Sequence, residues 1–318
     1  GPASGGPCSA GPKYSLMKHA RAGAASVPLP VAGRPTILGD YVTLTKLRLN
    51  GLVVATSAAG YYLGASGPPE LLSMALVALG TALVACGAAV LNQVYERDTD
   101  AMMSRTRMRP LPDGRVAPGD ARAFGIALSA VGLAMLAARA PLVTAGLALA
   151  TLVTYLFVYT PMKRRTPQAT LVGAVPGALP PLIGWTASHG GISTGGLALF
   201  AIVFLWQIPH FMAIAWLYRD DYLKAGFPML SVIDPSGRRV GRQALGYAVA
   251  LLVASAVPTL VGVGGVMYLV FTLALGLALV VLAARFARAP SDRSARALFL
   301  GSIVYLPLSW IALVADRM

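Results

Sequence analysis

The sequence predicts an all-α integral membrane protein, a bundle of nine transmembrane helices with a cytoplasmic amino terminus. Hydrophobic residues make up 56% of the 318 residues and charged residues only 12%, whereas a soluble domain carries about 25% charged residues. Apolar runs recur along the chain, and each approaches the ~20 residues that a helix needs to cross the hydrocarbon core. They cover residues 49–66, 71–95, 123–138, 141–159, 170–187, 195–217, 244–263, 266–284 and 297–315.

The distribution of charge sets the predicted orientation. With the amino terminus inside, the inner segments are residues 1–48, 96–122, 160–169, 218–243 and 285–296. They contain every Lys and Arg of the chain except Arg139 and Arg317. This asymmetry is what the positive-inside rule describes, and an error of one span would destroy it.

Polar chemistry is concentrated on the same side. All twelve acidic residues except Glu70 and Asp316 fall in the inner segments, and the outer loops are short and nearly uncharged. The net charge of +14 is explained by topology and by attraction to anionic membrane lipid, so we expect no nucleic-acid partner. The active face is predicted to be the inner one, cytoplasmic or matrix.

The first 37 residues differ from the rest of the chain. They are rich in Gly, Ala, Pro and Ser and lack the apolar core of a secretory signal. We expect residues 1–37 to be a disordered or tag-containing tail and residues 38–318 to be a single transmembrane domain. The short tail and the Ala/Gly/Arg-rich composition favour a bacterial cell inner membrane over a mitochondrial one.

An acidic segment lies at the end of the second apolar run. On a helix, Asn92, Glu96 and Asp100 spread across about 80° of one face. Asp98 points elsewhere, and we expect it to pair with a nearby arginine. An oxygen-lined face suits Mg²⁺, which takes one or two carboxylates together with substrate phosphates and water. The alternative is a solvated helix end with weak ion pairs.

A basic segment lies between the fourth and fifth apolar runs. Lys163, Arg164 and Arg165 are adjacent and could bind phosphate, with arginine making bidentate contacts. Topology alone also explains three cations at an inner boundary.

A third polar region follows the sixth apolar run. On one continuous helix, Trp206, His210 and Asp221 would lie within about 60° of each other. Gln207 and His210 are polar residues within a span, and such residues usually face the bundle interior, although a lone histidine can equally be a hydrogen-bonded packing residue. Asp220 and Asp221 are candidates for a second metal-binding edge opposite the first acidic face.

The spacing Asn-x-x-x-Glu-x-x-x-Asp at residues 92–100 resembles the first acidic motif of the UbiA superfamily of intramembrane prenyltransferases. Four strings extend the match to the protoheme IX farnesyltransferase (heme O synthase) family within that superfamily. They are Tyr-Glu-Arg-Asp-x-Asp-Ala-x-Met-x-Arg-Thr from residue 95, Lys-Arg-Arg-Thr-Pro-Gln from residue 163, Trp-Gln-x-Pro-His-Phe from residue 206, and Asp-Tyr-x-x-Ala-Gly-x-Pro-Met-Leu from residue 221. The similarity covers roughly residues 38–315.

The chain departs from the family patterns at three positions. Glu96 replaces the usual Asp of the superfamily motif and keeps the carboxylate, and Ala169 stands where the family often has Asn. The second superfamily motif, Asp-x-x-x-Asp, is incomplete because Leu217 occupies its first position. This weakens a model with two metal-binding motifs and fits the heme-modifying branch.

The resemblance implies a UbiA-like transmembrane prenyltransferase domain that joins farnesyl diphosphate to a vinyl group of heme B, adds water, and releases heme O and pyrophosphate. It implies Mg²⁺ as cofactor and the downstream heme A synthase as a partner. The implied catalytic residues are Asn92, Glu96, Asp100, Arg105, Lys163 and Asp221. The implied metal ligands are Asn92, Glu96, Asp100, Asp220 and Asp221. The implied diphosphate-binding residues are Arg97, Arg105, Arg109, Lys163, Arg164 and Arg165, and the implied heme-binding residues are Trp206, Gln207 and His210.

Two alternative functions stay open at this point. A UbiA-type prenyltransferase with an aromatic, quinone-precursor acceptor shares the first acidic motif, but it would be expected to show the second one. A transporter of an anionic metabolite could use basic loops and a broken helix, and inverted repeats would favour it.

Overall fold

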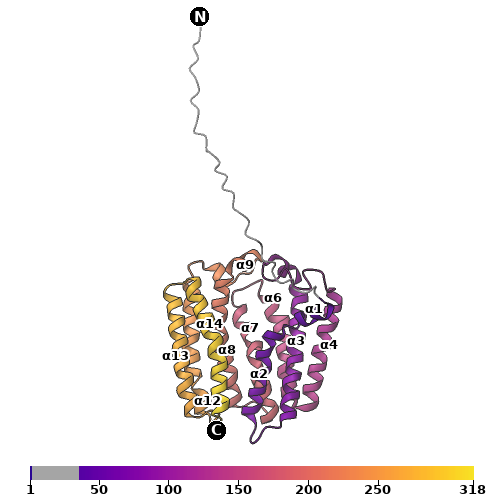
Figure 1. Ribbon diagram of the computed structural model, residues 1–318, viewed down its shortest axis with the longest axis vertical. Helices are drawn as coiled ribbons and strands as arrows, with labels where there is room; N and C mark the ends of the chain where they lie inside the picture. Colours follow the sequence, from indigo (N-terminus) through magenta and orange to yellow (C-terminus); the bar gives the residue numbers. More distant parts are fainter. Residues whose placement is uncertain (2–35) are drawn as a thin grey trace, which may run out of the picture. The chain divides into compact units, whose positions relative to one another are not determined.

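The computed structural model describes residue 1 and residues 36–318, and in this part of the chain every regular element is a helix (Figure 1). The predicted all-α class is confirmed. The predicted tail lies almost wholly outside the described residues, and residues 36–318 form one compact unit.

Consecutive long helices run in opposite directions, and the longest connections, residues 103–117 and 218–237, lie at the end of the bundle that carries α9 (Figure 1). They are α2 (Leu47–Gly64), α3 (Leu71–Met102), α4 (Pro118–Arg139), α5 (Leu142–Val153) with η1 (Thr154–Tyr159) and α6 (Thr160–Met162), α7 (Ala169–His189), α8 (Thr194–Leu217), α11 (Arg238–Ala254) with α12 (Val257–Leu260), α13 (Val266–Arg288) and α14 (Asp292–Ala315). The short helices are α1 (Ile37–Leu44), α9 (Arg219–Lys224) and α10 (Leu230–Ile233).

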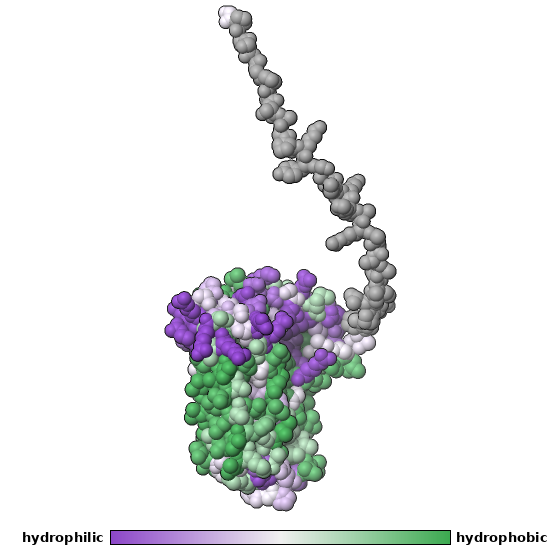
Figure 2. Space-filling view, turned by 60° about the vertical axis from the view of Figure 1, so that its left-hand side comes forward, coloured by the Kyte–Doolittle hydropathy of each residue, from purple (hydrophilic) through white to green (hydrophobic). Residues whose placement is uncertain are grey.

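Among the described helices, seven are long and apolar enough to cross a membrane. The two remaining predicted spans correspond to α2, with 18 residues, and α7, with 21 residues. Neither helix meets this combined condition of length and apolar character. The nine-span count and the side of the amino terminus therefore stay predictions. Figure 2 shows the apolar belt, with a hydrophilic cap at the end of the bundle that carries α9 in Figure 1.

Helices α2 and α7 pack closely because glycine lies where they cross. A Cβ on Gly184 would come within 1.8 Å of the carbonyl oxygen of Ser57, and a Cβ on Gly60 within 2.1 Å of the carbonyl oxygen of Pro181. Small residues permit this close backbone approach between membrane helices. The contact holds α7, which contains three prolines, in the middle of the bundle.

Helix α3 reaches beyond the apolar belt. Its 32 residues span about 48 Å at 1.5 Å per residue, against a hydrocarbon thickness of about 30 Å. The surplus length carries its acidic segment to the polar end of the bundle.

Helix α8 ends where the predicted sixth span ends and does not continue to Asp221. Tyr218 has φ −112° and ψ 23°, which ends α8 at Leu217, and Asp221 lies on the separate helix α9. The prediction that Trp206, His210 and Asp221 share one helical face is therefore wrong. The break places Asp220 and Asp221 in the polar cap.

Candidate active site

The acidic face of α3 is buried as the spacing predicted. Asn92, Glu96 and Asp100 are 2%, 6% and 1% exposed. Asp98 lies on the opposite side with 84% of its side chain exposed, and it pairs with Arg97 at 3.1 Å. The predicted separation of Asp98 from the acidic face is confirmed.

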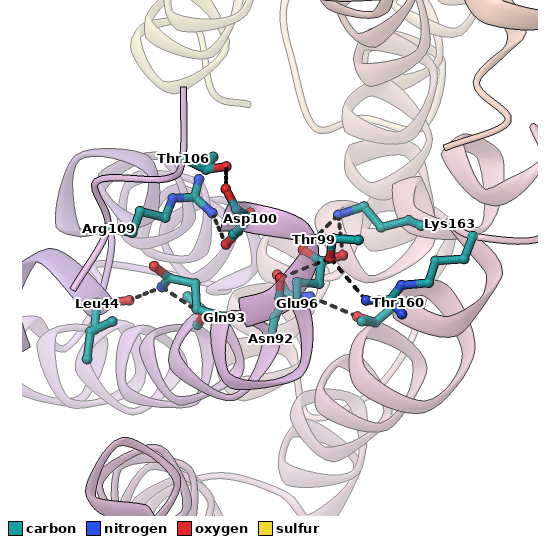
Figure 3. A network of polar contacts seen from close by, with 12 residues as sticks. Leu44, Asn92, Gln93, Glu96, Thr99, Asp100, Thr106, Arg109, Thr160 and Lys163 are labelled. Carbon is teal, nitrogen blue, oxygen red and sulfur yellow. Dashed lines mark hydrogen bonds and ion pairs between the residues drawn. The ribbon is translucent and has the colours of Figure 1, made fainter. Parts of the chain in front are cut away.

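Each buried carboxylate of α3 has its own cation (Figure 3). Lys163 Nζ donates to both oxygens of Glu96, at 2.9 and 3.2 Å, and Arg109 donates to Asp100 Oδ2 at 2.7 Å. Buried charges are tolerated when they are paired in this way. The predicted acidic and basic segments thus meet, although 67 residues separate Glu96 from Lys163.

Lys163 remains a cation in this environment. Burial alone would lower the pKa of Lys163, but Tyr159 and Glu96 outweigh burial and raise that pKa above its ordinary value. The Lys163 ammonium also lies 5.0 Å from the centre of the Tyr159 ring and 5.9 Å from that of Phe227, within cation–π range.

Asn92 is held by the irregular helix opposite it. Its amide donates to Thr160 Oγ1 at 3.0 Å, and Thr160 in turn donates to the carbonyl oxygen of Tyr155 at 2.8 Å. Thr160 directly follows the π-helical segment η1. π-Helical segments are frequent at functional sites because they redirect side chains. Here η1 places Tyr155 and Tyr159 on the side of the helix that carries Asn92 and Lys163 as neighbours.

Sequence reasoning missed Lys46. This residue is half-buried just before α2 and has a left-handed backbone, φ 52° and ψ 45°, which is uncommon for a residue with a Cβ. Burial, then the positive charges of Arg109 and Lys163, lowers the pKa of Lys46 to about 8. Lys46 is thus a third cation whose charge is coupled to the charges of Glu96 and Asp100. In the sequence it counted only toward topology, because its left-handed backbone is visible only in the structure.

The other predicted cations lie farther out. Arg164 donates to Thr99 on α3 at 3.0 Å, and the Arg105 guanidinium lies 5.0 Å from the centre of the Tyr218 ring. Arg97 and Arg165 are exposed in the cap. These four arginines are exposed and lie in the polar cap beyond the two ion pairs.

Asp221 lies in a separate open cleft in the cap, with a volume of about 450 Å³ and with Arg105, Asp220 and Lys224 in its lining. It accepts a hydrogen bond of 2.6 Å from Ser104, and this bond lowers the pKa of Asp221. Among the described residues, no three His, Cys, Asp or Glu side chains are close enough to hold a metal ion. A metal edge at Asp220 and Asp221 stays a prediction.

The donor set on α3 fits a magnesium diphosphate. Mg²⁺ needs only one or two protein carboxylates when phosphates and water complete its shell. Glu96 and Asp100 supply two buried carboxylates one helical turn apart, Asn92 adds an amide oxygen, and the cations beside them could turn to phosphate oxygens.

The three predicted heme-binding residues all lie on α8, but their side chains contact two different helices. Gln207 is turned to α7, where its amide donates to the carbonyl oxygen of Ala174 at 3.1 Å. His210 and Trp206 are turned to α14: His210 Nδ1 lies 2.8 Å from Ser302 Oγ, and Trp206 Nε1 donates to the carbonyl oxygen of Ser302 at 2.7 Å. Gln207 thus has a packing partner, while His210 lies between aromatic rings.

The model of the UbiA prenyltransferase family matches residues 53–306. The chain belongs to the UbiA prenyltransferase family. It is therefore a prenyltransferase, and the transporter alternative is not supported.

Relatives within the UbiA family share most of the chain. A protoheme IX farnesyltransferase of Solibacter usitatus is 45% identical over 287 residues, covering 87% of this chain and 98% of that protein. One from Opitutus terrae is 46% identical over 280 residues, covering 88% and 95%. The mitochondrial protoheme IX farnesyltransferase of Arabidopsis thaliana is 40% identical, covering 87% of this chain and 64% of that protein.

Solved UbiA structures share the fold. A digeranylgeranylglyceryl phosphate synthase superposes with a TM-score of 0.75 at 16% identity, covering 88% of this chain and 98% of that one. A UbiA homologue from Archaeoglobus fulgidus bound to GPP and Mg²⁺ gives 0.63 at 17% identity, covering 87% and 99%. The UbiA-like architecture expected from the acidic motif is confirmed.

Proposed function

We propose that this chain transfers the farnesyl group of farnesyl diphosphate to a vinyl group of heme B, with addition of water, giving heme O and pyrophosphate. The names and coverage of its relatives support this choice of substrates. The observation in the molecule that carries the proposal is the pair of buried carboxylates on α3, each held by a cation at the polar end of an apolar bundle.

In this proposal the diphosphate binds at the inner end of α3. Asn92, Glu96 and Asp100 would hold Mg²⁺, which supplies positive charge for the departing pyrophosphate. Lys163, Arg109 and Lys46 bind the diphosphate oxygens, and the exposed arginines attract the anion to the site; they are Arg97, Arg105, Arg164 and Arg165. Fixed cations aimed at developing negative charge are an effective source of catalysis.

The bond changes balance. The allylic carbon–oxygen bond of farnesyl diphosphate breaks, and its electron pair leaves with pyrophosphate. The π electrons of the heme vinyl group form the new carbon–carbon bond. Water then adds to the resulting cation and loses a proton, which leaves a hydroxyethylfarnesyl substituent. The apolar interior holds the isoprenoid and restricts early entry of water.

Heme would be positioned by His210 and Trp206, and a downstream heme A synthase would consume the product. His210 lies seven residues before the end of α8 and Glu96 six residues before the end of α3. These separations correspond to about 10 and 9 Å along the helices. Each side chain thus lies two to three turns from the polar end of its own helix.

The test is a product assay on the purified protein in detergent with heme B, farnesyl diphosphate and Mg²⁺, and a parallel sample containing EDTA. We expect a porphyrin whose mass has increased by a hydroxyethylfarnesyl group, and we expect EDTA to abolish it. Unmodified heme, together with pyrophosphate release when an aromatic acceptor is added, would assign the chain to the quinone-type prenyltransferases instead.

A further inference from the structure

A short series of hydrogen bonds joins His210 on α8 to helix α14. Ser302 Oγ lies 2.8 Å from His210 Nδ1 and 2.6 Å from the carbonyl oxygen of Phe299. Ser302 is fully buried, so water does not compete for these contacts.

The position of the Ser302 proton follows from these distances. A carbonyl oxygen cannot donate, and two oxygens 2.6 Å apart repel unless a proton lies between them. The single hydroxyl proton of Ser302 is therefore directed at Phe299. Its oxygen can only accept from His210, so the neutral imidazole carries its proton on Nδ1 and has a bare lone pair on Nε2.

The His210 ring is also fixed in orientation. It stacks on Trp206, with centroids 5.0 Å apart and planes at 23°, and it packs against Phe299 with centroids 5.0 Å apart and planes tilted by 30°. Among the described residues, Nε2 of His210 has no hydrogen-bond partner. This atom is nevertheless not fully buried. His210 is half-buried, and its Nε2 is accessible.

We infer that Ser302 is a positioning residue, whose hydroxyl holds His210 in the Nδ1–H form so that the bare Nε2 ligates the iron of the porphyrin acceptor. This inference rests on the proposed function for the identity of the acceptor. Imidazoles that ligate metals almost always donate their other ring N–H to a second group, and removing that group costs about 10–100-fold in metal affinity or activity.

The first experiment needs no heme. The chain has three histidines, so long-range ¹H–¹⁵N spectra of ¹⁵N-histidine protein in detergent can be assigned with His210→Gln. We expect the Nδ1–H form in the wild type and in Ser302→Thr, which keeps the hydroxyl, and a shift toward the Nε2–H form in Ser302→Ala. The Nε2–H form in the wild type, or an unchanged spectrum in Ser302→Ala, would overturn the inference.

The second experiment titrates ferric heme B into the same proteins and follows the Soret band and the electron paramagnetic resonance of imidazole-ligated iron. We expect Ser302→Ala to weaken heme binding about tenfold, with farnesyl diphosphate binding unchanged. Ser309→Ala is the matched control because Ser309 is buried on the same helix and contacts Thr272 at 3.4 Å. Equal heme affinity and spectra in Ser302→Ala and Ser309→Ala would refute the positioning role.

The two hypotheses fail in different ways. If the product assay yields heme O while Ser302→Ala retains wild-type ligation, only the positioning role of Ser302 fails. If no acceptor assay yields modified heme while the tautomer depends on Ser302, the proposed function fails and the hydrogen-bond geometry stands.

Discussion

Lys163 Nζ lies 2.9 Å from Glu96 Oε1, and this contact joins the basic loop after α6 to the acidic end of α3. The two side chains are 18% and 8% exposed, so solvent screens the pair only weakly. In the proposed reaction, the ammonium of Lys163 would turn to a diphosphate oxygen and the carboxylate of Glu96 would hold Mg²⁺. We infer that the ion pair keeps both charges in place for a magnesium diphosphate.

Neutralising Glu96 should remove turnover without unfolding the protein. Glu96→Gln keeps the shape of the side chain but removes its charge, and we expect kcat to fall by about 10²–10³-fold, the loss typical of a removed group that stabilises the transition state. Heme O formation by mass spectrometry is the measurement. Asp98→Asn, a change at the exposed acid of the same turn, is the control, and equal activity of the two variants would exclude Glu96 from the site.

The pair between Arg109 and Asp100 should contribute to stability as well as to activity. Asp100 is buried whereas Arg109 is partly exposed, so Arg109→Met leaves a buried carboxylate without its cation. We expect a loss of about 3 kcal/mol in the free energy of unfolding, measured by thermal unfolding in detergent.

The double variant Arg109→Met/Asp100→Asn separates the two roles of this pair. It should recover most of the stability, because no unpaired charge remains, but none of the turnover. Arg107→Met, at an exposed arginine two residues away, should change neither property. A double variant as unstable as Arg109→Met would show that the buried charge is not the cause.

Lys46 should give the reaction an alkaline limit. Its pKa is lowered to about 8, so its positive charge is present below that pH and is lost as the pH rises through it. We expect KM for farnesyl diphosphate to increase above pH 8 in the wild type, from steady-state kinetics between pH 6.5 and 9.5. Lys46→Arg should abolish the increase, since arginine stays charged, and an identical pH profile in this variant would remove Lys46 from diphosphate binding.

The sequence predicted the parts of this site that depend on local periodicity. The spacing of Asn92, Glu96 and Asp100 was sufficient to place them on one buried face, because α3 is regular through all three. It could not reveal Lys46, whose orientation depends on a left-handed backbone between two helices, or Ser302, which contacts His210 across 92 residues. The sequence could not reveal the hydrogen bonds of Gln207 either, because its partners are the backbone carbonyls of Ala174 and Val203, and a backbone acceptor has no signature in the sequence. A contact of Gln207 with heme stays a prediction.

The crossing of α2 and α7 gives a stability prediction that is independent of the reaction. Gly184→Ala would place a methyl group 1.8 Å from the carbonyl oxygen of Ser57, and a backbone atom can move away only if the helices separate. Overpacking of this kind typically costs about 1–3 kcal/mol. We expect a lower unfolding temperature and impaired turnover, because α7 leads directly from the basic loop.

Gly146→Ala is the matched control. Gly146 lies within α5, where an added Cβ meets no atom within 4 Å, and helix propensity favours alanine by about 1 kcal/mol. If Gly184→Ala unfolds at the temperature of Gly146→Ala, the close approach of the two helices is not required for the fold.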